Sequence, residues 1–165
     1  MKPQWSPDGR FLVKRGTSKK GINELIVLET SGFESVAKYT CGSTKNVVIN
    51  TVAWSGDGEK IVFGTDSHEC SGFNTVVWNP NSNSVVAGYR LSGPVHKVEF
   101  NEKDSQIVVK YRARDSFSAV AIIEHSKNYE ELVGRISTGN LRNCFTNEEL
   151  ERYAFDNDHA CLYFK

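Results

Sequence analysis

The chain has 165 residues, and its 20 Lys and Arg balance its 20 Asp and Glu to leave no net formal charge. This length suits one or two small domains, and the charge balance excludes the sequence-wide basic field that favours nucleic acid. No run of about 18 apolar residues is present to span a bilayer, and residues 1–20 lack the apolar core of a secretory signal. Neither nucleic acid nor a membrane is therefore expected as a partner.

The cysteines give an expectation about the compartment. They are four in number, and no two of them form a CxxC pair: Cys41, Cys70, Cys144 and Cys161. A domain of this size does not need a disulfide framework to fold. We therefore expect free thiols and a cytoplasmic location.

A polar turn that follows an aromatic residue recurs along the chain and organises it. The three copies are Trp5-Ser6-Pro7-Asp8-Gly9-Arg10-Phe11-Leu12, Trp54-Ser55-Gly56-Asp57-Gly58-Glu59-Lys60-Ile61 and the degraded Phe100-Asn101-Glu102-Lys103-Asp104-Ser105-Gln106-Ile107. The Asp-Gly steps are typical of hairpin turns because glycine tolerates positive φ, and the third copy lacks its glycine. A period of roughly 45–50 residues indicates a stack of small sheets.

Each copy predicts a set of short strands. The first copy is cut short and predicts strands over residues 2–5, 11–15, 23–28 and 33–39. The second copy predicts strands over 47–54, 60–65, 74–78 and 84–91, the third of them stopped by Asn79-Pro80 because proline cannot donate to a sheet ladder. The third copy predicts strands over 95–100, 106–112, 118–123 and 129–136. About twelve strands are thus expected, with no helix before residue 145.

Residues 137–165 break the period. Thr146 to Tyr153 predict a short helix, with Thr146 as its N-cap and Glu149 completing a capping box. We expect this segment to be an appendage packed on the last repeat.

The repeat resembles the blades of WD-repeat propellers and of the related TolB-type propellers, whose motif is W/F-S-P-D-G-x-x-L/I. Trp78-Asn79 resembles the Trp-Asp pair that names the WD repeat, although Asn79 replaces the Asp and the preceding Gly-His is missing. The resemblance implies an all-β fold, a partial β-propeller with three four-stranded blades (about 2–45, 46–93 and 94–136) and a helical tail at 137–165. It assigns structural roles in the blades to Trp5, Asp8, Gly9, Trp54, Asp57, Gly58, Trp78 and Phe100.

The tail carries a second resemblance. Cys144 to Tyr153, followed by Cys161, is similar to the closing motif of propellers at the C-terminus of bacterial signal-transduction ATPases and related sensor proteins. This resemblance implies that the chain corresponds to the last three blades of a propeller, or to a stand-alone relic of one.

Three blades do not close a ring, because a closed propeller needs at least about four. The first blade would expose a face and an edge that a neighbour normally covers, and such surfaces drive association. The sequence therefore predicts that a second copy or another chain supplies the missing blades, unless the chain is a fragment of a longer product.

No motif indicates catalysis, since there is no G-x-S-x-G elbow and no phosphate-binding glycine loop. Three metal-ligating residue types adjoin at His68-Glu69-Cys70, but no second pair accompanies them, so a surface loop is expected. Lys110, Arg112 and Arg114 would share one face of a strand and could contact a polyanion or an acidic partner, or form the wet face of an outer strand. His125 is expected to face water.

The sequence as a whole predicts a non-catalytic WD-repeat-like module, without cofactor or metal, that serves as a protein–protein interaction or sensor scaffold. The alternative is a ligand-recognition or gating part of a larger enzyme or signalling ATPase. A weaker third alternative is nucleic-acid contact through the basic residues near Arg112.

Overall fold

The computed structural model describes residues 1–43, 45–70, 72–113 and 118–125. Over these residues the chain forms eleven strands and no helix. Consequently, no helix in this part of the chain is long and apolar enough to cross a membrane.

The strands form three antiparallel sheets, each made from consecutive strands. Sheet 1 contains β1 (Gln4–Trp5), β2 (Phe11–Thr17), β3 (Asn23–Glu29) and β4 (Ser35–Thr40). Sheet 2 contains β5 (Ile49–Trp54), β6 (Ile61–Thr65), β7 (Thr75–Asn79) and β8 (Ser84–Tyr89). In the described residues, sheet 3 contains β9 (Val95–Phe100), β10 (Gln106–Arg112) and β11 (Ser118–Glu124).

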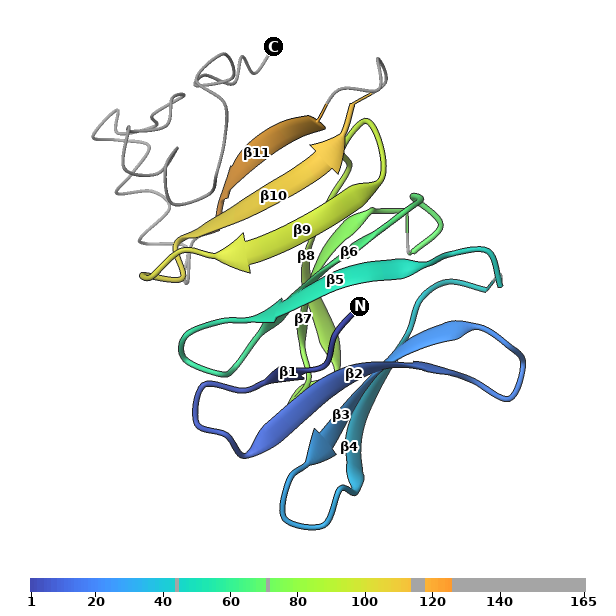
Figure 1. Ribbon diagram of the computed structural model, residues 1–165, viewed down its shortest axis with the longest axis vertical. Helices are drawn as coiled ribbons and strands as arrows, with labels where there is room; N and C mark the ends of the chain where they lie inside the picture. The colour runs from blue at the N-terminus through green and yellow to red at the C-terminus, as the bar shows by residue number, and fades with distance from the viewer. Residues whose placement is uncertain (44, 71, 114–117, 126–165) are drawn as a thin grey trace.

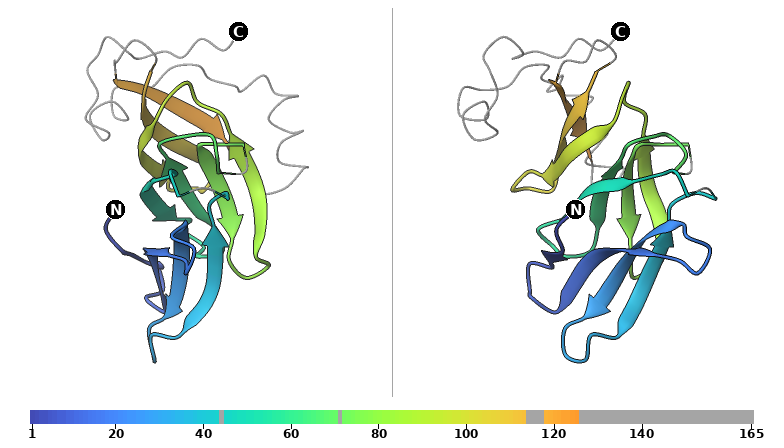
Figure 2. Two further views of the ribbon diagram at one scale, coloured as in Figure 1. Left: turned by 90° about the vertical axis from the view of Figure 1, so that its right-hand side faces the viewer. Right: turned by 45° about the vertical axis from the view of Figure 1, so that its right-hand side comes forward.

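The sheets follow one another in chain order, with sheet 2 between the other two (Figures 1 and 2). Their first strands β1, β5 and β9 are neighbours, since β5 contacts both of the others (Figure 1). Two apolar cores lie between the sheets: one joins sheets 1 and 2, and the other joins sheets 2 and 3.

Sheet 2 is covered on both faces, and the alternation of side chains along β6 explains how. Ile61 and Phe63 pack in the core shared with sheet 1, whereas Val62 packs in the core shared with sheet 3. Every residue of β6 is buried as a result.

The all-β expectation is confirmed, and the eleven described strands match the predicted segments closely. β9 and β10 have the predicted bounds, and β7 ends at Asn79, immediately before Pro80. The strand predicted over 129–136 and the helix predicted over Thr146 to Tyr153 lie outside the described residues.

The prediction of free thiols is wrong for two of the four cysteines. Cys41 and Cys70 form a disulfide, and both residues are fully buried. The bond joins the segment after β4 to the loop between β6 and β7, so it links sheets 1 and 2. These segments are 29 residues apart in sequence and meet only because the sheets stack, which the spacing of the cysteines does not reveal. Cys144 and Cys161 lie outside the described residues.

Candidate interaction face

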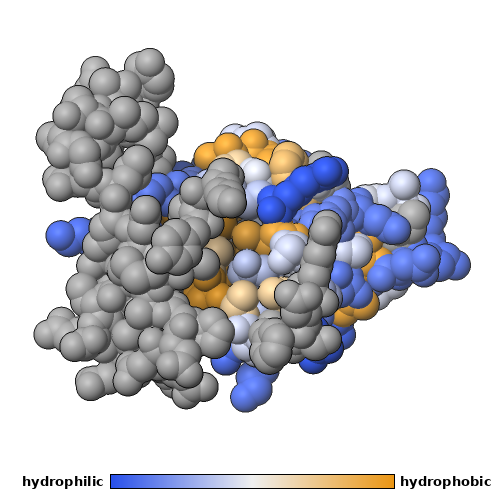
Figure 3. Space-filling view, turned by 90° about the horizontal axis from the view of Figure 1, so that it is seen from above, coloured by the Kyte–Doolittle hydropathy of each residue, from blue (hydrophilic) through white to orange (hydrophobic). Residues whose placement is uncertain are grey.

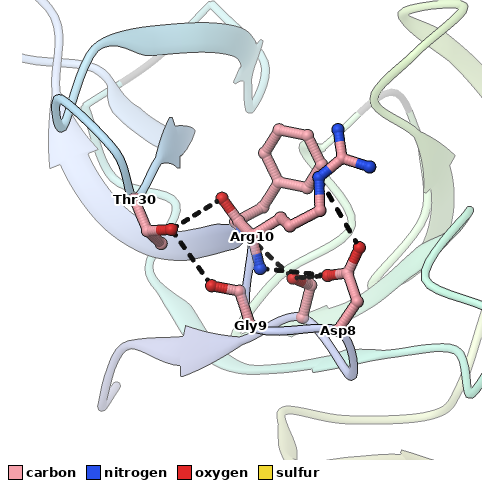
Figure 4. A network of polar contacts seen from close by, with 6 residues as sticks. Asp8, Gly9, Arg10 and Thr30 are labelled. Atoms are coloured by element: carbon pink, nitrogen blue, oxygen red, sulfur yellow. Dashed lines mark hydrogen bonds and ion pairs between the residues drawn. The ribbon is translucent and has the colours of Figure 1, made fainter.

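The repeated turns connect the first and second strands of each sheet, and Ser and Asp side chains hold them. In the first copy the Ser6 hydroxyl donates to the Asp8 carboxylate (2.6 Å), and the backbone N–H of Phe11 donates to the Ser6 hydroxyl oxygen (2.9 Å). Asp8 also accepts from the N–H of Arg10, and Thr30 donates to two carbonyls of the turn (Figure 4). The hydroxyl of Ser6 and the N–H of Arg10 both lower the pKa of Asp8.

The second copy repeats this arrangement. The Ser55 hydroxyl donates to Asp57 at 2.6 Å and accepts the N–H of Lys60 at 2.9 Å. Gly9 and Gly58 both have a φ of 72°, the left-handed conformation that the Asp-Gly steps predicted. Asp8, Gly9, Asp57 and Gly58 therefore have structural roles in their turns.

The third turn keeps the same backbone hydrogen bonds with different residues. The Asn101 side-chain oxygen accepts the N–H groups of both Ser105 and Gln106, which replaces the two acceptors of the Ser-Asp pair. Asp104 takes the glycine position with a φ of 52°. Aspartate tolerates this conformation better than most residues, so the turn survives without its glycine.

Asp104 also joins two repeats. Its carboxylate accepts the backbone N–H groups of Gly56 (2.7 Å) and Asp57 (3.1 Å) in the second turn. These are charge-assisted hydrogen bonds at a largely buried residue, so they contribute more than neutral ones. The residue that departs from the motif therefore fixes sheet 3 against sheet 2.

The aromatic residues singled out in the sequence differ in their surroundings. Trp78 is fully buried, and its ring lies 5.7 Å from that of Tyr39 in sheet 1. Trp54 is half-buried and donates its indole N–H to the carbonyl of Gln4 at 3.1 Å, while Phe100 packs against the core between sheets 2 and 3. Trp5, in contrast, is 57% exposed.

Trp5 belongs to the face of sheet 1 that points away from sheet 2, which we call the open face. Directly opposite residues on antiparallel strands share a face. Trp5 lies opposite Leu12, and Leu12 lies opposite Leu28, so the three side chains form an apolar row across the sheet. The adjacent row on this face is Lys14, Ile26 and Lys38.

The repeat shows what the open face corresponds to in sheet 2. The residues equivalent to Trp5, Leu12 and Leu28 are Trp54, Ile61 and Trp78, which also lie opposite one another. Ile61 and Trp78 are fully buried because sheet 1 covers them. In the described part of the chain, no element covers the corresponding row of sheet 1, so Leu12, Ile26 and Leu28 are only half-buried.

The charges of the open face differ from those of its covered equivalent. Lys14 and Lys38 occupy the positions of Phe63 and Gly88 in sheet 2. Lys38 is exposed and Lys14 half-buried. A partner that covers this face must therefore offer an apolar strip flanked by acidic or polar groups.

The other candidate residues are held in structural contacts or remain predictions. Lys110 and Arg112 lie on β10, which pairs on both sides with β9 and β11, so the prediction of an outer strand is wrong. Arg114 lies outside the described residues, and a contact of this group with a polyanion stays a prediction. Seen from the end where sheet 3 lies, hydrophobic and hydrophilic side chains share the described surface (Figure 3).

Two residues of the loop His68-Glu69-Cys70 are held in other contacts. Cys70 is in the disulfide, and the Nε2 atom of His68 lies 2.7 Å from the carbonyl oxygen of Leu91. Among the described residues no group of three His, Cys, Asp or Glu could hold a metal ion.

The prediction that His125 faces water is wrong, because His125 is only 4% exposed and packs edge-on against Phe100.

Comparison with known proteins gives a likeness of fold. No protein-family model matches the sequence, and no curated protein matches it. Among solved structures, the chain is similar to a chain of Kuenenia stuttgartiensis hydrazine synthase, with a TM-score of 0.58 and 16% sequence identity. The match covers 74% of this chain and 33% of that chain, so this chain spans about a third of the length of the solved one. At this identity the likeness concerns the fold alone.

Proposed function

We propose that the chain is a non-catalytic module of the β-propeller type, similar to WD-repeat or TolB-type propellers, that binds a protein through the open face. Three consecutive sheets with neighbouring first strands support this assignment, because the blades of a propeller are arranged in that way. The partner is a second copy of the chain or another chain that supplies further blades.

The equivalence between the open face and the covered face of sheet 2 is the observation that carries the proposal. Trp5, Leu12 and Leu28 repeat a row whose counterparts Ile61 and Trp78 are fully buried by a neighbouring sheet. Trp5 is 57% exposed, and covering the exposed part of a Trp side chain contributes about 3 kcal/mol. A row of this composition on a sheet favours association with another sheet.

The alternative function is that of a ligand-recognition or gating part of a larger enzyme or signalling ATPase. The solved chain that shares the fold belongs to an enzyme by name, and the match covers 33% of it, so a fold of this kind can form one part of a larger enzyme chain. In that case the open face would meet further blades of the same assembly.

The disulfide bears on the compartment. The cytoplasmic expectation depended on free thiols, and disulfides persist mainly in oxidising compartments. The bond between Cys41 and Cys70 therefore favours a secreted, periplasmic or otherwise oxidising location over the cytoplasm.

Acrylamide quenching of Trp5 fluorescence tests whether the open face becomes covered. The Trp5 signal is obtained as the difference between the parent chain and Trp5→Phe, because Trp54 and Trp78 contribute equally to both. We expect Trp5 to be quenched freely in dilute protein and to be shielded as the concentration rises or a partner is added. Equal quenching of Trp5 at every concentration and with every partner tried would count against the proposal.

A further inference from the structure

A cavity lies between sheets 1 and 2 at the end of the molecule where β2 begins and β3 and β5 end. Its volume is about 330 Å³, which lies at the lower end of the range for small-molecule sites. The lining residues from sheet 1 are Phe11, Val27, Glu29, Val36 and Ala37. Those from sheet 2 and its turns are Trp54, Gly58, Pro80 and Asn81.

Most of the lining residues are apolar in type, and two of them carry aromatic rings, although polar and apolar atoms contribute about equally to the wall. Trp54 lines the cavity, and its indole N–H is already satisfied because it donates to the Gln4 carbonyl. Phe11 provides the second ring. Aromatic faces attract organic cations because of their negative quadrupole, and indole does so most strongly.

Glu29 is the single formally charged residue among the described residues that line this cavity. It lies directly opposite Phe11 on the paired strands β2 and β3, which brings the carboxylate and the ring to the same side of the sheet. The nearest cation in sequence, Arg10, is not part of the lining. Its guanidinium pairs with Asp8 at 4.0 Å and lies over the Phe11 ring, 5.4 Å from the ring centroid, so this ring already attracts a cation. The Glu29 carboxylate therefore remains available to a ligand.

The corresponding cleft between sheets 2 and 3 is lined differently. At the cleft between sheets 2 and 3, the positions of Phe11 and Glu29 are taken by Lys60 and Asn79. The Asn79 side chain is occupied there, since its oxygen accepts the N–H groups of Asn81 and Ser82. The cavity at the second cleft is also lined by the rings of Trp54 and Phe100 and by carboxylates, but its lining includes Lys97, which pairs with Glu99 at 2.8 Å. The cavity at the first cleft differs because its lining has a carboxylate and no lysine or arginine among the described residues.

We propose that the cavity between sheets 1 and 2 binds a small organic ammonium ion, with the cation between the Glu29 carboxylate and the rings of Phe11 and Trp54. The carboxylate supplies charge, the rings supply cation–π attraction, and the apolar remainder of the wall covers the hydrocarbon part of the ligand. This site is independent of the open face, because Phe11 and Glu29 face sheet 2 whereas Leu12 and Leu28 face away from it.

The test is a titration with benzyltrimethylammonium chloride at constant ionic strength, followed by the NMR signal of the Trp54 indole N–H and by calorimetry. We expect saturable binding of the cation and weaker binding of the neutral probe 2-phenylethanol. Glu29→Gln should reduce the affinity about tenfold, and Phe11→Leu should also reduce it. Glu34→Gln is the matched control, because it makes the same change of charge in the same hairpin outside the cavity, and it should leave the affinity unchanged.

Three outcomes would overturn the proposal. They are the absence of a saturable response, equal affinity for the neutral probe, and equal loss of affinity in Glu29→Gln and Glu34→Gln. Urea unfolding of each variant shows whether it is folded, and Leu12→Lys serves as a further control that should alter association through the open face and leave cation binding intact.

Discussion

Breaking the bond between Cys41 and Cys70 should cost a large part of the stability of the chain. The bond closes a loop across a sequence separation of 29 residues. In the chain-entropy description, a loop of this length stabilises the folded state by about 3.5 kcal/mol relative to the open chain. Small domains are stable by about 5–15 kcal/mol, so the loss should be plain in any equilibrium measurement.

The assay is urea unfolding followed by tryptophan fluorescence, with and without a phosphine reductant, at one fixed protein concentration. We expect the midpoint to fall strongly on reduction and the slope to rise, because the reduced unfolded chain is less compact and exposes more surface. The variant Cys41→Ala/Cys70→Ala is the control, because its midpoint should be low and should not respond to the reductant. Alanine is chosen because both sites are fully buried in the core between sheets 1 and 2.

Thiol mapping gives an independent reading of the same claim. Peptides containing Cys41 and Cys70 should escape alkylation in the unfolded, unreduced protein and become labelled after reduction. Labelling of both without reductant, or identical midpoints in the two conditions, would refute the reasoning.

Three further predictions concern the repeated turns, and urea unfolding measures all of them. Asp104→Ala removes both acceptors for the second turn and places alanine at a φ of 52°, so it should cost about 2–4 kcal/mol, and Asp104→Asn should cost less. Gly9→Ala should cost about 1 kcal/mol through backbone strain alone, because no atom lies within 4 Å of the added Cβ, and a neutral result would contradict the left-handed turn. The folded-state pKa of Asp8 is lowered by Ser6 and by the backbone of Arg10, so its stabilisation is present above the unfolded pKa and is lost as the pH falls below about 4. Asp8→Asn should therefore show a flatter loss of stability between pH 6 and about 3 than the parent, and parallel curves would contradict this.

The strands were predictable because alternation and turn chemistry are local. The Asp8-Gly9 and Asp57-Gly58 steps fix where two strands must reverse, and both glycines have the expected conformation. The third turn looked degraded in the sequence because the motif was defined by residue types and not by the hydrogen bonds that those residues make. The side-chain oxygen of Asn101 accepts both N–H groups of this turn, so the hydrogen bonds persist although the residue types differ.

The disulfide and the two candidate sites could be predicted only in part. An uncovered face is expected from a stack of three blades, because three blades do not close a ring, but its residues require the register that places Trp5 opposite Leu12. Phe11 pairs with Glu29, one residue beyond the predicted 23–28 segment, so this pair required the observed register. Contacts between sheets, including the disulfide and the Asp104 link, depend on how the sheets stack, which no local pattern encodes.

The central claim is that the open face of sheet 1 is a binding surface for another sheet. Light scattering across a dilution series tests it most directly, with Leu12→Lys to alter the open face and Val86→Lys as the control. Val86 is also an exposed apolar strand residue, 47% exposed on β8, and it lies outside the open face.

We predict that the 165-residue chain and Val86→Lys associate with rising concentration and that Leu12→Lys remains monomeric while still folded. A parent chain that is monomeric throughout would exclude self-association and leave another chain as the partner. Association that Leu12→Lys and Val86→Lys affect equally would contradict the account.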